Sequence, residues 1–118
     1  ISSFGRNISP EWVEGELLAE SVILQAIVVG DGRPFCVALL MPLDSSTSDL
    51  YLQVAVDAAN TRLPDYARVR SWVRLGAPLS AAQDLLTANG RPRRDLIEAH
   101  FGAVIERCYH SSRELLTV

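Results

Sequence analysis

Three arginines in four positions stand out in the segment from residue 86 to residue 94, which reads LTANGRPRR. Asn89-Gly90 is a strong tight-turn dipeptide, because both residues tolerate the positive φ that such turns require. Guanidinium groups bind carboxylates and phosphates through paired hydrogen bonds. The segment is therefore either a loop that brings positive charge to an anionic group or a solvated turn before an amphipathic helix. The charge lies on Arg91, Arg93 and Arg94.

A second polar loop, residues 4–7, reads FGRN. Gly5 permits a close approach of the backbone or a positive φ, and Arg6 places a positive charge beside it. A helix is expected directly after this loop, since Ser9 is a good N-cap and Pro10 fits the first helical position.

Other chemistry-bearing side chains have simpler structural explanations. Cys108, His110 and His100 do not give an acceptable set of metal ligands by spacing alone, so no metal site is predicted. Glu11 and Glu14 lie three residues apart on the expected helix. Complementation of the helix dipole or pairing across an interface explains these two carboxylates more simply than acid–base catalysis.

Length and composition favour one domain that needs no disulfides. The chain has 118 residues, a net charge of −3 and two cysteines in apolar patterns. The negative charge argues against a nucleic-acid footprint, and apolar runs of about eight residues are too short to form a transmembrane segment. We expect a cytoplasmic protein, with or without peripheral contact to a membrane. Because the chain begins at Ile1, we also expect it to be part of a longer protein.

The elements that position the two loops can be read from the chain. Apolar runs at 22–29 and 34–41 around a GDGR turn predict a hairpin covered on both faces. Residues 69–75 alternate as a third strand, with Trp72 between two arginines on its more exposed face. That face could stack nucleotide bases, although a strand covered by arginine stems is the simpler interpretation. Helices are expected over 10–20, 49–63 and 93–110.

The predicted fold class is therefore α+β: a small three-stranded sheet, made of a central hairpin plus a third strand, flanked by three main helices. Four segments then resemble one family in order and spacing. They are ISSFGRNISPEWVE at 1–14, VVGDGRP at 28–34, LPDY at 63–66 and LTANGRPRR at 86–94. Together they resemble the C-terminal domain of adenylate-forming enzymes, in particular the long-chain acyl-CoA synthetases.

The resemblance implies that residues 1–118 form a single C-terminal lid domain, attached to a large N-terminal adenylation domain that is absent from this chain. In such a fatty acid–CoA ligase the N-terminal domain holds the ATP, Mg²⁺ and acyl sites. The lid closes for acyl-adenylate formation from a fatty acid and ATP, and then rotates so that coenzyme A can attack the adenylate. The resemblance thus implies that this domain alone binds no cofactor and is inactive by itself.

Motif matching also assigns residues. It places Arg91 at the catalytic position where the family usually has lysine, and this chain contains no lysine at all. The matching residues that support this loop are Thr87, Gly90 and Arg94, and Glu14 matches a family glutamate expected between the domains. The coenzyme A side would be formed by the other loop, with Gly5, Arg6 and Asn7. Because arginine replaces lysine, a non-catalytic docking or regulatory module derived from such a lid is the alternative.

Overall fold

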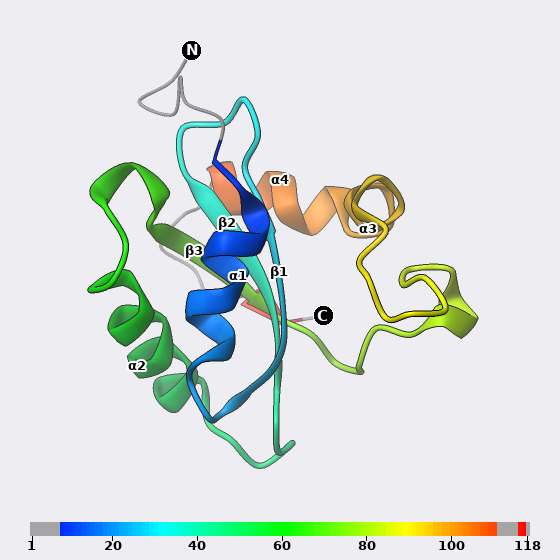
Figure 1. Cartoon of the computed structure of the whole chain (residues 1–118), viewed down its shortest axis with the longest axis horizontal. Coiled ribbons are helices and arrows are strands. Elements are labelled where there is room, and N and C mark those ends of the chain that lie inside the picture. Colours follow the sequence, from blue (N-terminus) through cyan, green and yellow to red (C-terminus); the bar gives the residue numbers. More distant parts are fainter. Residues whose placement is uncertain (1–7, 111–115, 118) are drawn as a thin grey trace.

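The computed structural model describes residues 8–110, 116 and 117. A mixed β-sheet lies between two layers of helices, α1 with α2 on one side and α3 with α4 on the other (Figure 1). The described elements, in chain order, are α1 Pro10–Leu18, β1 Ile23–Val29, β2 Cys36–Pro42, α2 Asp49–Asn60, β3 Val69–Arg74, α3 Arg94–His100, α4 Gly102–His110 and β4 Leu116–Thr117.

The predicted hairpin is confirmed, since β1 and β2 pair antiparallel across the GDGR turn. The strand order is β1-β2-β3-β4, so β2 is a central strand whereas β1 forms an edge. Strand β3 runs parallel to β2, and the two-residue β4 runs parallel to β3. The sheet therefore has the three predicted strands as its main body, extended by a short fourth strand.

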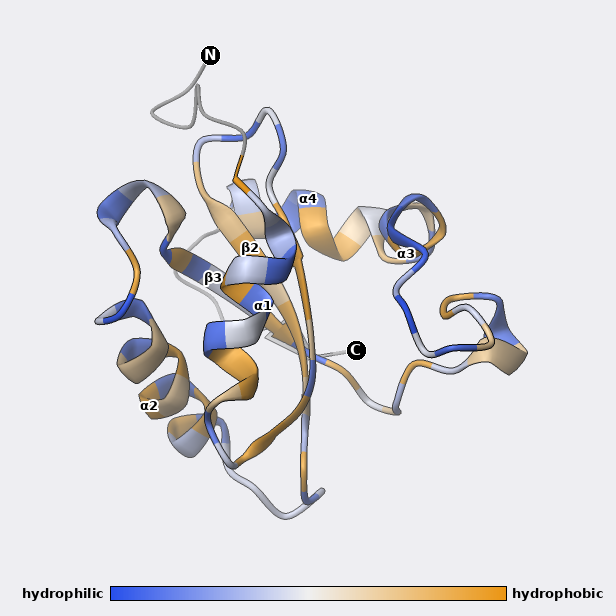
Figure 2. Cartoon of the chain, viewed as in Figure 1, coloured by the Kyte–Doolittle hydropathy of each residue, from blue (hydrophilic) through white to orange (hydrophobic). Residues whose placement is uncertain are grey.

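Alternating residues of β1 and β2 supply two separate apolar clusters, one on each face of the sheet. Val13 and Leu17 of α1 cover one face together with α2, whereas Ile97 of α3 and Ile105 of α4 cover the other. Apolar residues accordingly run along both hairpin strands in Figure 2. Coverage on both faces, which the continuous apolar runs predicted, is confirmed.

The expected alternation along the third strand is wrong at Trp72. The pairing register of β3 with β2 shifts between Cys36 and Val37, which places Val69 and Trp72 in the same apolar cluster. Trp72 is buried, and its indole N–H donates a hydrogen bond to Gln53 Oε1 of α2 at 2.8 Å. An irregularity in strand pairing changes which side chains face the core, so this residue is unavailable for stacking on a base.

The last predicted helix, 93–110, is two helices that meet at Phe101. Phe101 has φ −104° and ψ 17°, and the next residue, Gly102, has a low helix propensity. Ile97 of the first helix and Ile105 of the second pack into the same apolar cluster.

Candidate functional site

The LTANGRPRR segment forms a small, hydrogen-bonded hairpin loop. Leu86 and Pro92 form an antiparallel bridge, and the Thr87 N–H donates to the Arg91 carbonyl at 2.8 Å. The Gly90 N–H donates to the Thr87 carbonyl, and Thr87 Oγ1 accepts from the Arg91 N–H at 3.1 Å. Gly90 alone takes the positive φ of the turn, at +83°. Thr87 and Gly90 thus set the backbone that carries Arg91.

The side chain of Arg91 is the positive charge of this loop that has no partner among the described residues. Arg91 is exposed, and its guanidinium has no hydrogen bond or ion pair with any residue in the described part of the chain. Its neighbour Arg93, by contrast, lies 3.9 Å from a carboxylate oxygen of Asp84. An external anion could therefore bind Arg91 without displacing a partner within the described ranges.

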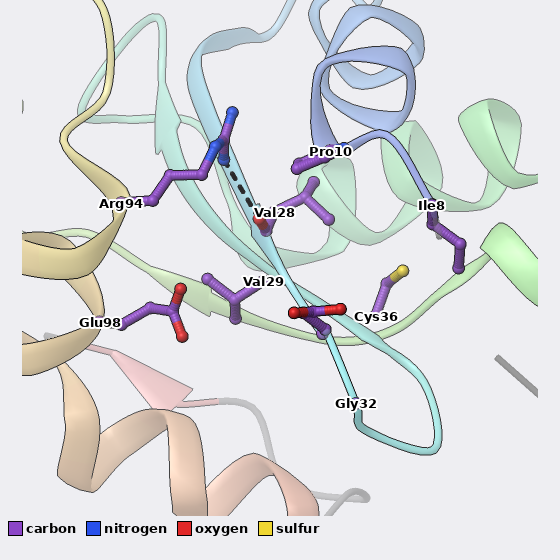
Figure 3. A pocket seen from close by; sticks show the side chains of 10 residues that line it. Ile8, Pro10, Val28, Val29, Gly32, Cys36, Arg94 and Glu98 are labelled. Carbon is purple, nitrogen blue, oxygen red and sulfur yellow. Dashed lines mark hydrogen bonds between the residues drawn. The ribbon is translucent and has the colours of Figure 1, made fainter. Parts of the chain in front are cut away.

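Arg94 joins three elements that are far apart in the sequence. Its two terminal nitrogens donate to the two carboxylate oxygens of Glu14, at 2.6 and 2.9 Å. Glu14 Oε2 also accepts the backbone N–H of Val28 at 2.8 Å. Arg94 donates to the Val28 carbonyl at 3.3 Å, and a dashed line marks this hydrogen bond in Figure 3. We call Glu14, Val28 and Arg94 the clamp. It connects α1, β1 and the beginning of α3.

Burial strengthens the clamp. Glu14 is only 6% exposed, so its charge needs the paired hydrogen bonds that Arg94 supplies. The hydrogen bond with the Glu14 carboxylate raises the pKa of Arg94, and partial desolvation opposes this shift.

A second carboxylate, that of Glu11, lies 3.6 Å from Arg94. The backbone N–H of Glu11 itself, followed by the Ser9 hydroxyl, lowers the pKa of Glu11.

The clamp borders a cavity of about 300 Å³ between the beginning of α1, the β1–β2 turn and α3. Val28, Val29 and Cys36 give it an apolar part, and the side chains of Arg94 and Glu98 reach it from α3 (Figure 3). Sequence reasoning missed this cavity. The available signal was the i, i+4 spacing of Arg94 and Glu98 on a helix, but that spacing cannot show the strand opposite.

The remaining predicted site residues have different outcomes. Gly5, Arg6 and Asn7 lie outside the described residues, so their role stays a prediction. Glu14 was predicted to lie between domains. In the structure both of its carboxylate oxygens are bound within the chain, and the interdomain role stays a prediction.

Within residues 8–110, 116 and 117, three or more His, Cys, Asp or Glu side chains do not gather in a group that could hold a metal ion. In the same part of the chain, the helices are too short or too polar to cross a membrane.

Parts of three larger solved structures share this fold. The didomain of carboxylic acid reductase from Segniliparus rugosus, in complex with AMP, matches with a TM-score of 0.79 and 18% identity over 92% of this chain and 17% of its own. The adenylation domain of the carboxylate reductase from Mycobacterium chelonae matches with a TM-score of 0.78 and 18% identity, over 88% of this chain and 18% of its own. An acyl-CoA synthetase from Brucella canis matches with a TM-score of 0.64 and 20% identity, over 87% of this chain and 18% of its own.

The chain belongs to the AMP-binding enzyme C-terminal domain family, whose model matches residues 1–113. It is also similar to the long-chain-fatty-acid–CoA ligase FadD15 of Mycobacterium tuberculosis, with 25% identity over 133 residues and 93% of this chain. The M. bovis protein of the same name gives the same figures. The chain spans 22% of the length of these curated relatives. The family expected from the sequence motifs is therefore confirmed.

Proposed function

We propose that this chain is the mobile C-terminal domain of a fatty acid–CoA ligase. It would close over an N-terminal adenylation domain for ATP-dependent acyl-adenylate formation, and then rotate for thioester formation with coenzyme A. Family membership and the similarity to a long-chain-fatty-acid–CoA ligase support the proposal. The observation that carries it is the exposed guanidinium of Arg91, which has no acceptor within the described residues.

Arg91 has a defined chemical task in this proposal. Its guanidinium would bind the carboxylate of the fatty acid or the α-phosphate of ATP as negative charge develops between them. Arginine keeps the charge of the usual lysine, and its planar fork can bind either group through two hydrogen bonds. A guanidinium is wider than an ammonium, however, and cannot act as a point charge between two oxygens. Attraction is therefore kept, while optimal placement is reduced.

The other substrates and Mg²⁺ would be bound mainly by the N-terminal domain. In the second orientation, the loop with Gly5, Arg6 and Asn7 would line the path of coenzyme A. We expect Gly5→Leu in the full-length protein to slow thioester formation while adenylate formation stays nearly intact, because a side chain there would obstruct the thiol arm. Equal loss of both half-reactions would instead indicate misfolding.

The proposal is tested on the full-length protein by measuring the two half-reactions separately. ATP–pyrophosphate exchange with fatty acids reports adenylation, and thioester formation from preformed acyl-adenylate reports transfer. Losing one well-placed charged donor costs on the order of 100- to 1,000-fold in rate. We expect Arg91→Ala to reduce adenylation at least about tenfold and hardly to affect transfer. Arg91→Lys should retain or raise activity.

Arg107 provides a matched control for that experiment. It is exposed and lies on α4, and its side chain also has no hydrogen bond or ion pair with the described residues. Arg107→Ala should adenylate at the parent rate. If Arg91→Ala does so as well, the loop is only a turn and the proposal fails at this residue.

The alternative is a docking or regulatory module without chemistry, which the arginine at the usual lysine position favours. The two functions differ in the rest of the protein. A ligase needs a Ser/Thr/Gly-rich phosphate-binding loop upstream of this domain, and an upstream sequence without it would refute the ligase proposal. We also expect the isolated 118-residue chain to form no acyl-CoA from ATP, fatty acids and coenzyme A.

A further inference from the structure

We propose that Glu14 and Arg94 are positioning residues, which hold the Arg91 loop in one place relative to α1 and β1. The kinetic part of this inference rests on the proposed function of Arg91, whereas the structural part does not. Neither residue is placed at a substrate. Both act through the backbone that leads to Arg91.

The first step is that each of the three residues of the clamp is hydrogen-bonded to the other two. Glu14 receives two hydrogen bonds from Arg94 and one from the Val28 N–H. Val28 uses its carbonyl for Arg94 as well. Two parallel hydrogen bonds between a guanidinium and a carboxylate fix the orientation of both groups, so the beginning of α3 is held at one angle to α1 and β1.

The second step concerns the contacts that fix the beginning of α3. Ile97 is the one fully buried side chain of this seven-residue helix, and Leu96 packs partly buried against the same apolar cluster. Apolar contacts fix the rotation and sliding of a short helix only weakly, because the hydrophobic effect is not directional. The ion pair at Arg94, the first residue of the helix, adds a directional contact.

The third step is the short connection from the clamp to Arg91. Only Pro92 and Arg93 lie between Arg91 and Arg94. Pro92 forms the antiparallel bridge with Leu86, and the Arg93 N–H donates a hydrogen bond to the Leu85 carbonyl at 2.9 Å. Leu85 is 3% exposed and belongs to the apolar core. The loop thus has two anchors, the core at one stem and the clamp at the other.

The first experiment measures loop order without any activity. Hydrogen exchange is followed in the full-length protein on peptides that cover residues 84–93. Arg94→Gln should speed exchange of the Gly90 and Arg91 amides about tenfold or more, while exchange in β2 stays at the parent rate. The control is Arg70→Gln, since Arg70 is also paired with a carboxylate, that of Asp65, but both of these side chains are exposed. Unchanged exchange in the loop of Arg94→Gln would overturn the clamp.

The second experiment separates positioning from folding. At a temperature well below unfolding, Arg94→Gln should lower the kcat of adenylation about tenfold or more, with KM values for ATP and fatty acid within about twofold. Arg94→Lys keeps one charged hydrogen bond and should recover part of the rate. Glu14→Gln, which keeps an acceptor for the Val28 N–H, serves if Arg94→Gln does not fold.

The outcomes are distinct. Faster loop exchange with a parental kcat would show that the clamp is structural only, and would overturn its positioning role. A parent protein that forms no adenylate would refute the proposed function. The hydrogen-exchange experiment would then still test whether the clamp holds the Arg91 loop in place.

Discussion

Replacing Arg94 by methionine should destabilise the chain markedly, although the side-chain volume changes little. The change removes both guanidinium hydrogen bonds from the Glu14 carboxylate and leaves it the Val28 N–H at 2.8 Å. The Glu14 side chain is 8% exposed and that of Arg94 is 24% exposed. The variant therefore keeps a charge that water hardly reaches.

The size of the effect follows from this geometry. Removing one partner of a buried ion pair costs about 3–5 kcal/mol. Since Arg94 is partly exposed and Glu14 keeps one donor, we expect about 2–3 kcal/mol. An unfolding entropy of about 2.1 cal/mol/K per residue gives roughly 0.25 kcal/mol/K for a chain of this length. The melting temperature should then fall by about 8–12 °C.

Urea and thermal unfolding of the single variants and of Glu14→Leu/Arg94→Met test this value. Replacing both partners by apolar residues is far less costly than removing one, although the Val28 N–H then loses its acceptor, at about 1–3 kcal/mol. The double variant should therefore lose at least about 1 kcal/mol less than the sum of the single losses. Additive losses, or a loss in Arg94→Met no larger than that of the surface variant Arg70→Gln, would refute the reasoning.

Three further predictions concern stability. In Gly30→Ala, the new Cβ would lie 3.0 Å from the Phe35 carbonyl oxygen, so urea unfolding should show a loss of about 1–3 kcal/mol; an unchanged midpoint would contradict it. Asn60→Ala leaves the N–H and carbonyl of Val69 unpaired, costing about 2 kcal/mol, and Asn60→Asp, which keeps the acceptor, should lose less. Burial raises the pKa of Cys36 to about 11. The unfolded thiol ionises at lower pH, so unfolding free energy should fall as pH rises from about 9 to about 11, and an equal slope in Cys36→Ala would exclude this cause.

Local patterns in the sequence determined the elements and the family. The GDGR turn between two apolar runs predicts the hairpin, because glycines there allow the backbone to reverse, and the observed pairing confirms it. Pro10 after Ser9 placed the start of α1, since proline lacks the N–H that a first helical turn does not use. The LTANGRPRR loop was predicted as a turn for a similarly local reason, the positive φ now found at Gly90.

Only the tertiary structure decided which charges are paired. Glu14 and Arg94 are separated by 80 positions, and their pairing depends on α1 and α3 both lying against β1, which no local spacing encodes. The same holds for Trp72, whose burial follows from an irregularity in the pairing of β3 with β2. Apart from the family resemblance, the sequence does not distinguish the charges of Arg91, Arg93 and Arg94 from one another. Folding makes Arg94 a buried partner of Glu14 and places Arg93 near Asp84, and it leaves Arg91 unpaired within the described residues. The reason is physical: a buried carboxylate requires a charged partner, whereas an exposed arginine does not.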